Sequence, residues 1–254
     1  MKRGVGAGPD LALIHGWGLG SAVWQPLVAA LSRTWRVHLV DLPGYGESSG
    51  GSEDFTQAAR DLIDALPDSV TLCGWSLGAM LAMRAALLAP QRVAGLLLVG
   101  ATASFTQRGD WYPAQAPPVL DSFSDSLGRQ PEQTLQRFVA LLCQGDQHAR
   151  TLTRTLLACL RGQPAPAGET LRRGLDWLRE VDLRPLLPTM TTRCLLIHGE
   201  HDRLNPVAAA QYLATTLPDA RLAIVAGAGH APFLTDPEGF VRLLEAFCHA
   251  RPAT

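Results

Sequence analysis

The sequence predicts an α/β protein with a mostly parallel central sheet, helices on both sides of it and an inserted helical cap. Six short apolar runs alternate with helical patterns along most of the 254 residues, which is typical of a doubly wound sheet. The alternation stops between residues 104 and 186, where only helical patterns continue. A serine in the setting Gly-Trp-Ser-Leu-Gly follows the third apolar run, and it indicates chemistry at one edge of that sheet.

The six apolar runs predict the strands. They are near-continuous rather than alternating, so we expect strands that are covered on both faces. In chain order the runs are Leu11–His15, Val37–Leu42, Val70–Cys73, Gly95–Gly100, Cys194–His198 and Leu222–Ala226. The apolar periodicity of Leu77–Leu88 and of Pro237–Cys248 predicts helices.

The stretch 104–186 is rich in Pro, Gln and Arg and shows no strand pattern. Amphipathic helices are predicted at Pro131–Cys143 and Gln147–Arg161. An insertion of about 80 helical residues between two strands predicts a cap over the carboxyl edge of the sheet, where ligands of such folds bind. We therefore divide the chain into a core, residues 1–103 and 187–254, and a cap, residues 104–186.

Composition argues against several classes of protein. The formal net charge is −1, which gives no broad basic surface for nucleic acid or for an anionic membrane. The first apolar stretch, Leu11–Ile14, is too short for a signal peptide, and no segment suits a membrane span. The five scattered cysteines indicate free thiols in a reducing cytoplasm. The sequence leaves the oligomeric state open, with a monomer as the simplest arrangement.

The pentapeptide GWSLG, Gly74–Gly78, predicts a nucleophilic serine. A sharp turn from strand to helix forces the residue at its apex into a strained conformation, and small residues two positions away relieve the crowding. The N-terminus of the following helix also directs backbone N–H groups toward Ser76. Because the same pattern occurs in glycine-rich loops, the assignment depends on a base and an acid elsewhere in the chain.

A base and an acid follow in the required order. A serine hydroxyl needs a base and the base needs an orienting acid, and after such a turn their usual chain order is Ser, acid, His. Asp202 follows the fifth apolar run, in HGEHDRLNP, and His230 follows the sixth, in AGAGHAPF. We expect both loops to leave the sheet beside Ser76, so that Ser76, Asp202 and His230 form a catalytic triad. The alternative is an aspartate that starts a surface turn and an unrelated loop histidine.

The tetrapeptide HGWG, His15–Gly18, follows the first apolar run and predicts an oxyanion site. Two preorganised backbone donors can stabilise a tetrahedral intermediate by several kcal/mol. The N–H groups of Trp17 and of Leu77 are the candidates, and the Trp17 indole is expected to line the pocket.

Two other groups of polar residues suggest sites that we do not expect. In HGEHD, the residues His198, Glu200, His201 and Asp202 resemble a metal-binding cluster. Side chains that leave a strand alternately point to opposite faces, so we expect no metal site there. Asp41, in VDLPGYGES, is expected to fix its turn rather than to act as a second catalytic acid.

Together these motifs resemble the α/β-hydrolase superfamily over the whole length of the chain. HGWGLGSAVW, VHLVDLPGYGES, GWSLGAM and GHAPFLTDPEGF are most similar to the BioH family of carboxylesterases. That family acts in biotin synthesis, where it removes the methyl group from the methyl ester of pimeloyl-acyl-carrier protein.

The resemblance implies the triad and the oxyanion site named above, and no cofactor. It also implies an acyl-binding stretch in the cap, made of Phe138, Val139, Ala140, Leu141 and Leu142. The sequence departs from the family at two positions. Ala79 stands where a third glycine is usual after the serine turn, and Leu142 stands where the family has a polar residue.

The cap also carries a basic pattern. Arg150, Arg154 and Arg161 share one helical face, and Arg137 lies on the preceding predicted helix. Between residues 129 and 161 there are five arginines against two acidic residues, Glu132 and Asp146. An acidic carrier protein would be attracted to such a surface, so we expect Arg137, Arg150 and Arg154 to dock the acyl-carrier protein. A solvated helix face is the alternative.

The sequence therefore predicts a cytoplasmic serine carboxylesterase that hydrolyses the methyl ester of pimeloyl-acyl-carrier protein. Two alternatives stay open. One is a generic short-chain carboxylesterase that ignores the carrier protein, and the other is a ligand sensor or a lyase on the same fold.

Overall fold

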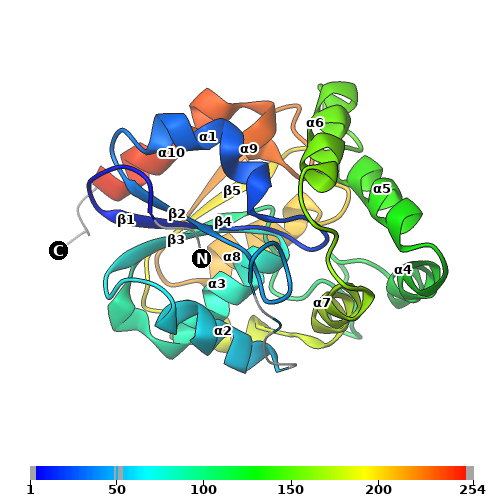
Figure 1. Ribbon diagram of the computed structural model, residues 1–254. Coiled ribbons are helices and arrows are strands. Elements are labelled where there is room, and N and C mark those ends of the chain that lie inside the picture. Colours follow the sequence, from blue (N-terminus) through cyan, green and yellow to red (C-terminus); the bar gives the residue numbers. More distant parts are fainter. Residues whose placement is uncertain (1–3, 49, 51–53, 250–254) are drawn as a thin grey trace.

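The computed structural model describes residues 4–48, 50 and 54–249. Its centre is a six-stranded sheet in the order β2-β1-β3-β4-β5-β6, with neighbouring strands parallel (Figure 1). Each predicted run forms one strand, so the predicted parallel sheet is confirmed. The strands are β1 (Asp10–Ile14), β2 (Arg36–Val40), β3 (Val70–Trp75), β4 (Val93–Val99), β5 (Cys194–Gly199) and β6 (Ala220–Val225).

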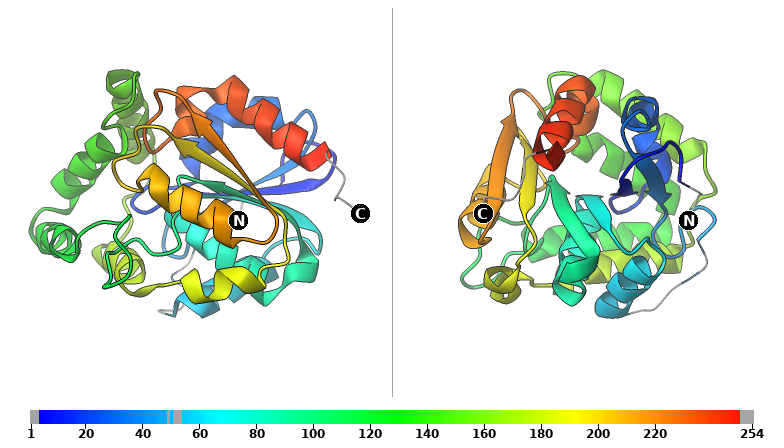
Figure 2. Two further views of the ribbon diagram at one scale, coloured as in Figure 1. Left: turned by 180° about the vertical axis from the view of Figure 1, so that it is seen from behind. Right: turned by 90° about the vertical axis from the view of Figure 1, so that its left-hand side faces the viewer.

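Helices cover both faces of the sheet (Figures 1 and 2). One face carries α1 (Gln25–Leu31) and α10 (Pro237–His249), and the other carries α2 (Phe55–Asp64), α3 (Leu77–Leu88) and α8 (Val207–Thr216). The segments that connect the strands and longer helices contain the short helices η1 (Ser21–Trp24), η2 (Pro90–Arg92), η3 (Arg184–Thr189) and α9 (Pro232–Thr235). Every residue of β3 and β5 is buried, as their near-continuous apolar runs predict.

The prediction that all six strands are covered on both faces is wrong for β6. None of its six residues is fully buried, and Ile224 is 43% exposed. The reason is its position, because β6 forms one edge of the sheet and has β5 as its only neighbouring strand. An edge strand gains less cover from its surroundings than a central one.

Residues 104–186, which we call the cap segment, lie between β4 and β5 in the chain. They contain α4 (Pro117–Arg129), α5 (Pro131–Leu142), α6 (Ala149–Arg161) and α7 (Gly168–Glu180). The two helices predicted in this segment correspond to α5 and α6, whereas α4 and α7 were not predicted. Residues 104–116 form no helix and pair only through isolated bridges, such as the one between Ser104 and Asp182, so the expectation of a helical stretch is wrong there.

The cap segment contacts the loops that follow β1 and β5. The Trp17 indole Nε1, after β1, donates a hydrogen bond of 2.8 Å to the carbonyl oxygen of Leu171 on α7. The Gln115 side chain donates to the carbonyl oxygens of Arg203 and Leu204, after β5, at 3.0 and 2.7 Å. The four helices of the cap segment therefore lie at the carboxyl edge of the parallel sheet (Figure 1).

None of the described helices is both long enough and apolar enough to span a bilayer. All five cysteines are free thiols.

Candidate active site

Ser76 lies at the turn between β3 and α3, in a strained backbone conformation. Its φ of 56° and ψ of −119° are unusual for a residue with a side chain. In the described part of the chain Ser76 is the only residue other than glycine with a positive φ. Its backbone N–H donates to the Val99 carbonyl on β4 at 2.9 Å, which holds the turn against the neighbouring strand.

The glycines on either side of Ser76 have no room for a side chain. A Cβ at Gly74 would collide with the backbone of residues 78 and 79, and a Cβ at Gly78 would collide with the carbonyl oxygens of residues 14 and 15. The first turn of α3 therefore packs directly on β3 and on the end of β1. This close approach is the physical reason for the Gly-x-Ser-x-Gly spacing.

Asp202 and His230 form a buried hydrogen-bonded pair. His230 Nδ1 lies 2.6 Å from Asp202 Oδ2, and both side chains are fully buried. The other ring nitrogen, His230 Nε2, is buried and has no hydrogen-bond partner in the part of the chain that the structure describes. A buried polar atom without a partner is rare, and here it leaves one nitrogen of an oriented imidazole free to exchange a proton.

The ring of His230 lies next to the strand that carries Ser76. The Trp75 indole donates a hydrogen bond of 2.8 Å to the His230 carbonyl oxygen. The centroids of the Trp75 and His230 rings are 5.7 Å apart. No hydrogen bond joins Ser76 to His230 among the described residues. The structure thus brings all three predicted residues to one edge of the sheet, after β3, β5 and β6, and pairs two of them directly.

Asp202 is held in place by its own loop. Its Oδ1 accepts the backbone N–H groups of Leu204 and Asn205, both at 2.9 Å. On its other side, His198 Nε2 lies 3.4 Å from Oδ2 and 2.7 Å from the Asn205 carbonyl. Burial lowers the pKa of His198, and its contact at 2.7 Å with the Asn205 carbonyl fixes the ring behind Asp202.

The candidate oxyanion donors are the backbone amides of Trp17 and Leu77. Among the described residues the Trp17 amide has no hydrogen-bond acceptor, and the Leu77 amide is the first of α3, where no intrahelical acceptor exists. A Cβ built on Gly16, which precedes Trp17, would lie 3.2 Å from the Cβ of Ser76. The loop that carries the Trp17 amide therefore lies against the serine.

Two side chains that the sequence did not single out fix this loop. His15 Nε2 accepts the Leu42 N–H at 3.0 Å, so its Nδ1 carries the proton and donates to the Gly16 carbonyl at 2.7 Å. Burial lowers the pKa of His15 to about 4, in keeping with this neutral form. The Tyr45 hydroxyl accepts the Gly18 N–H at 3.1 Å. In the sequence, the signal for His15 is its position at the end of the first apolar run and at the start of HGWG.

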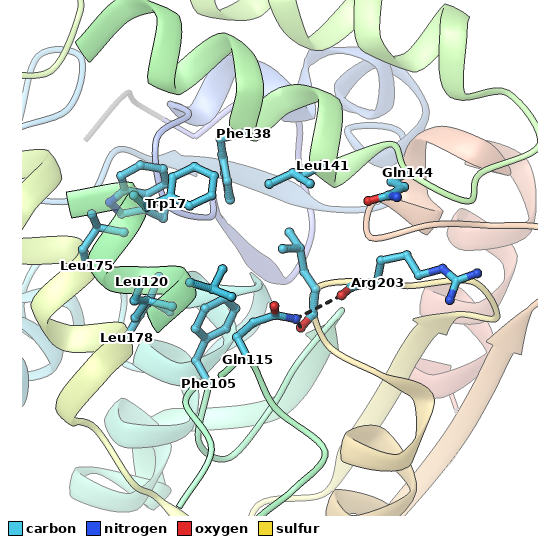
Figure 3. A pocket seen from close by; sticks show the side chains of 13 residues that line it. Trp17, Phe105, Gln115, Leu120, Phe138, Leu141, Gln144, Leu175, Leu178 and Arg203 are labelled. Carbon is cyan, nitrogen blue, oxygen red and sulfur yellow. Dashed lines mark hydrogen bonds between the residues drawn. The ribbon is translucent and has the colours of Figure 1, made fainter. Parts of the chain in front are cut away.

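A mostly apolar pocket of about 160 Å³ lies between the cap segment and the core (Figure 3). Trp17 and Leu175 lie at one end of it, and Gln144 and Arg203 lie at the other (Figure 3). Its apolar walls come mainly from α4, α5 and α7, through Val119, Leu120, Phe123, Phe138, Leu141, Leu175 and Leu178. Such a lining suits an aliphatic chain rather than a polar ligand.

The predicted acyl-binding stretch only partly faces this pocket. Phe138 and Leu141 line it, whereas Val139 and Leu142 are buried elsewhere and Ala140 is exposed. The five residues lie on α5, where each residue turns the side chain by about 100°. They therefore cannot all face one side, and residues three apart, 138 and 141, do.

A second, more open groove of about 600 Å³ runs between α4, α5 and α6. It shares Phe123, Leu141 and Gln144 with the pocket, so the two spaces are adjacent. Arg137 lines this groove from α5, and Ala149 and Thr153 line it from α6. The groove thus lies beside the apolar pocket on the surface of the cap segment.

The three arginines predicted to dock the carrier, Arg137, Arg150 and Arg154, are exposed and have no ion-pair partner among the described residues. Asp146, one of the two acidic residues in segment 129–161, is buried. Glu132 is therefore the only acidic side chain that segment 129–161 exposes, and the exposed surface is more basic than the sequence indicates.

The HGEHD cluster and Asp41 accept hydrogen bonds from backbone N–H groups. Glu200 Oε2 accepts the Gly227 N–H at 2.9 Å, and Asp41 Oδ1 accepts the Ser21 N–H at 2.8 Å. In the described residues, no three His, Cys, Asp or Glu side chains are grouped as metal ligands would be.

Comparisons with known proteins show the family to which the chain belongs. Residues 11–243 match the model of the alpha/beta hydrolase family. The chain is 43% identical over 243 residues to a pimeloyl-acyl-carrier-protein methyl ester esterase of Nitrosomonas europaea, a match that covers 95% of this chain and 96% of that protein. It is 42% identical over 242 residues to the protein of the same name from Serratia marcescens, covering 95% and 94%.

Among solved structures, an esterase of Exiguobacterium antarcticum superposes with a TM-score of 0.88 at 25% identity, covering 97% of this chain and 94% of that one. A hydrolase of Oleispira antarctica has the same fold, with a TM-score of 0.86 at 20% identity over 98% and 96% of the two chains. The chain therefore belongs to the alpha/beta hydrolase family, in the branch that contains the pimeloyl-acyl-carrier-protein methyl ester esterases.

Proposed function

We propose that this protein is a serine carboxylesterase that hydrolyses the methyl ester of pimeloyl-acyl-carrier protein, in biotin synthesis. The observation that carries the proposal is the buried Asp202–His230 pair, whose free Nε2 lies at the sheet edge that also carries the strained Ser76. The names of the relatives from Nitrosomonas europaea and Serratia marcescens supply the substrate.

In the first half of the reaction, Ser76 attacks the methyl-ester carbonyl. His230 Nε2 takes the proton from the Ser76 hydroxyl, and Asp202 stabilises the imidazolium through the bond at Nδ1. The carbonyl oxygen becomes an oxyanion between the Trp17 and Leu77 amides, which have no competing acceptors among the described residues. The tetrahedral intermediate then expels methoxide, which leaves as methanol with the proton from His230.

In the second half, water replaces methanol. His230 Nε2 takes a proton from the water as its oxygen attacks the acyl carbonyl, and the same amides hold the second oxyanion. Collapse of this intermediate returns the proton to the Ser76 oxygen and releases the free carboxylate. Every proton transfer uses a side chain of the chain itself, and the proposal includes no cofactor.

The apolar pocket suits the methylene chain of a pimeloyl group. Each Å² of apolar surface that the acyl chain buries against the pocket walls stabilises the complex by about 25 cal/mol. Trp17, at one end of the pocket, belongs to the loop that carries one of the oxyanion donors. The groove between α4, α5 and α6 shares lining residues with the pocket, and we propose that the carrier-bound end of the acyl chain reaches the surface along it. Arg137 on this groove, with Arg150 and Arg154 on α6, forms the surface that we propose docks the acidic carrier protein.

The proposal implies a cytoplasmic enzyme, since its carrier-bound substrate belongs to that compartment, and the free cysteines are compatible with it. The test is methanol release from a methyl pimeloyl carrier protein, followed over many turnovers beside hydrolysis of p-nitrophenyl acetate. We expect a clear preference in kcat/KM for the carrier-bound ester. Comparable values for both would favour a generic esterase, and binding without methanol release would favour a sensor.

A further inference from the structure

We infer that Asp146 is a positioning residue for His230. The inference rests on the proposed role of His230 as the catalytic base. Asp146 lies in the turn between α5 and α6, far from His230 in the chain, and it is only 7% exposed. Nothing in the reaction described above uses this buried carboxylate.

The Asp146 carboxylate holds both flanks of His230. Its Oδ2 accepts the Gly229 N–H at 2.8 Å and the Thr235 hydroxyl at 2.6 Å, while Oδ1 accepts the His148 N–H at 2.7 Å. A buried carboxylate is costly unless donors surround it, and three charge-assisted hydrogen bonds offset that cost. Of these donors, Gly229 immediately precedes His230, and Thr235 lies in the short helix α9 that follows it.

The rest of the α5–α6 turn pairs with the same loop. Gln147 N–H donates to the Gly227 carbonyl at 2.9 Å, and His230 N–H donates to the Leu142 carbonyl at 3.2 Å. The loop follows β6, the edge strand, and the described sheet has no further strand beyond it to supply partners. The turn of the cap segment takes the place of that missing neighbour.

The position of this loop decides where His230 Nε2 points. The His230 ring is tied to Asp202 at Nδ1, but its Cα follows the backbone of residues 229 and 230, which Asp146 and Leu142 hold. If the Gly229 N–H lost its acceptor, the loop could move outward and the imidazole would tilt away from Ser76. A misplacement of about 1 Å can cost about 10²-fold in rate, so the expected loss lies in the turnover step.

The test is Asp146→Asn in the full-length protein. An amide has one oxygen, so one of the three donors at least must face an N–H₂ group. On p-nitrophenyl acetate we expect kcat to fall about 10- to 100-fold while KM stays within about threefold. The far-downfield proton NMR signal of the short His230–Asp202 hydrogen bond should shift or disappear, which a purely structural role elsewhere in the cap segment would not cause.

A matched control and a second pair of variants make the test decisive. Asp182 is a half-buried aspartate of the cap segment, and it accepts the Arg184 N–H at 3.1 Å, away from the His230 loop. Asp182→Asn should therefore keep kcat and the NMR signal. Thr235→Val, which keeps the shape and removes one donor, should lower kcat about three- to tenfold, and Thr235→Ser should restore it.

The inference is overturned if folded Asp146→Asn keeps the wild-type kcat, or if Asp182→Asn loses as much. Should Asp146→Asn fail to fold, wild-type kcat in Thr235→Val overturns it instead. Failure of the proposed function is distinguishable, since it would appear as no esterase activity in the wild type. The NMR signal would then decide alone: a change in Asp146→Asn supports the positioning role, and an unchanged signal overturns it.

Discussion

Replacing Asp202 by asparagine should lower kcat by about 10⁴-fold and leave KM almost unchanged. Asp202 Oδ1 accepts two backbone N–H groups at 2.9 Å, and Oδ2 accepts His230 Nδ1–H at 2.6 Å. The single oxygen of asparagine will stay with the two backbone donors, because an N–H₂ group there would leave both unpaired. Its N–H₂ group then faces Nδ1, which becomes an acceptor, so the proton moves to Nε2 and the ring cannot take a proton from Ser76.

A 10⁴-fold loss corresponds to about 5.4 kcal/mol of activation free energy. The assay is steady-state hydrolysis of p-nitrophenyl acetate, with circular dichroism to show that the variant is folded. Glu200→Gln is the control, since Glu200 is exposed and accepts only the Gly227 N–H among the bonds described above, and it should stay within about threefold of the wild type. Activity of Asp202→Asn within tenfold of the wild type, with a large loss in Glu200→Gln, would refute the reasoning and make Glu200 the orienting acid.

Changing Arg137, Arg150 and Arg154 together to Glu should lower kcat/KM on the carrier-bound ester at least about tenfold and leave p-nitrophenyl acetate hydrolysis unchanged, and added salt should mimic this. Parallel losses on both substrates would contradict a docking role. Leu178→Trp should fill the pocket and raise KM for the carrier-bound pimeloyl ester several-fold, and an equal rise for the acetate ester would place the acyl chain elsewhere. The free energy of unfolding should fall as the pH drops from 6.5 to 4. Burial lowers the pKa of His15 to about 4, so in this pH window His15 takes up a proton in the unfolded chain but not in the folded one. Measured by urea unfolding, the free energy of unfolding of His15→Gln should fall by about 3 kcal/mol less than that of the wild type over this pH range. An equal fall in both proteins would refute the assignment.

The sheet and the order of the functional loops could be predicted because they depend on local patterns. Central parallel strands are buried on both faces, so β3 and β5 appear in the sequence as near-continuous apolar runs. The same pattern could not show that β6 forms the edge, since strand order depends on pairing between distant segments. The strained conformation of Ser76 follows from two glycines within five residues, which is also a local signal.

Contacts between distant segments could not be predicted. Asp146 looks like one more surface charge in the sequence, yet it is buried against Gly229 and Thr235, more than 80 residues later. His198 looks like part of a metal cluster, and it lies instead behind Asp202. In the cap segment, α4 begins with two prolines and α7 with a glycine, so composition hid two helices that are stabilised by packing on their neighbours.

The measurement that tests the central claim most directly is methanol release from methyl pimeloyl carrier protein by the wild type and by Ser76→Ala. The account predicts many turnovers for the wild type and a loss of at least about 10³-fold in the variant, because nucleophile and base act as one unit. The thermal unfolding transition of the variant should stay close to that of the wild type. Retention of more than a few per cent of the turnover in folded Ser76→Ala would contradict the assignment of Ser76 as the nucleophile.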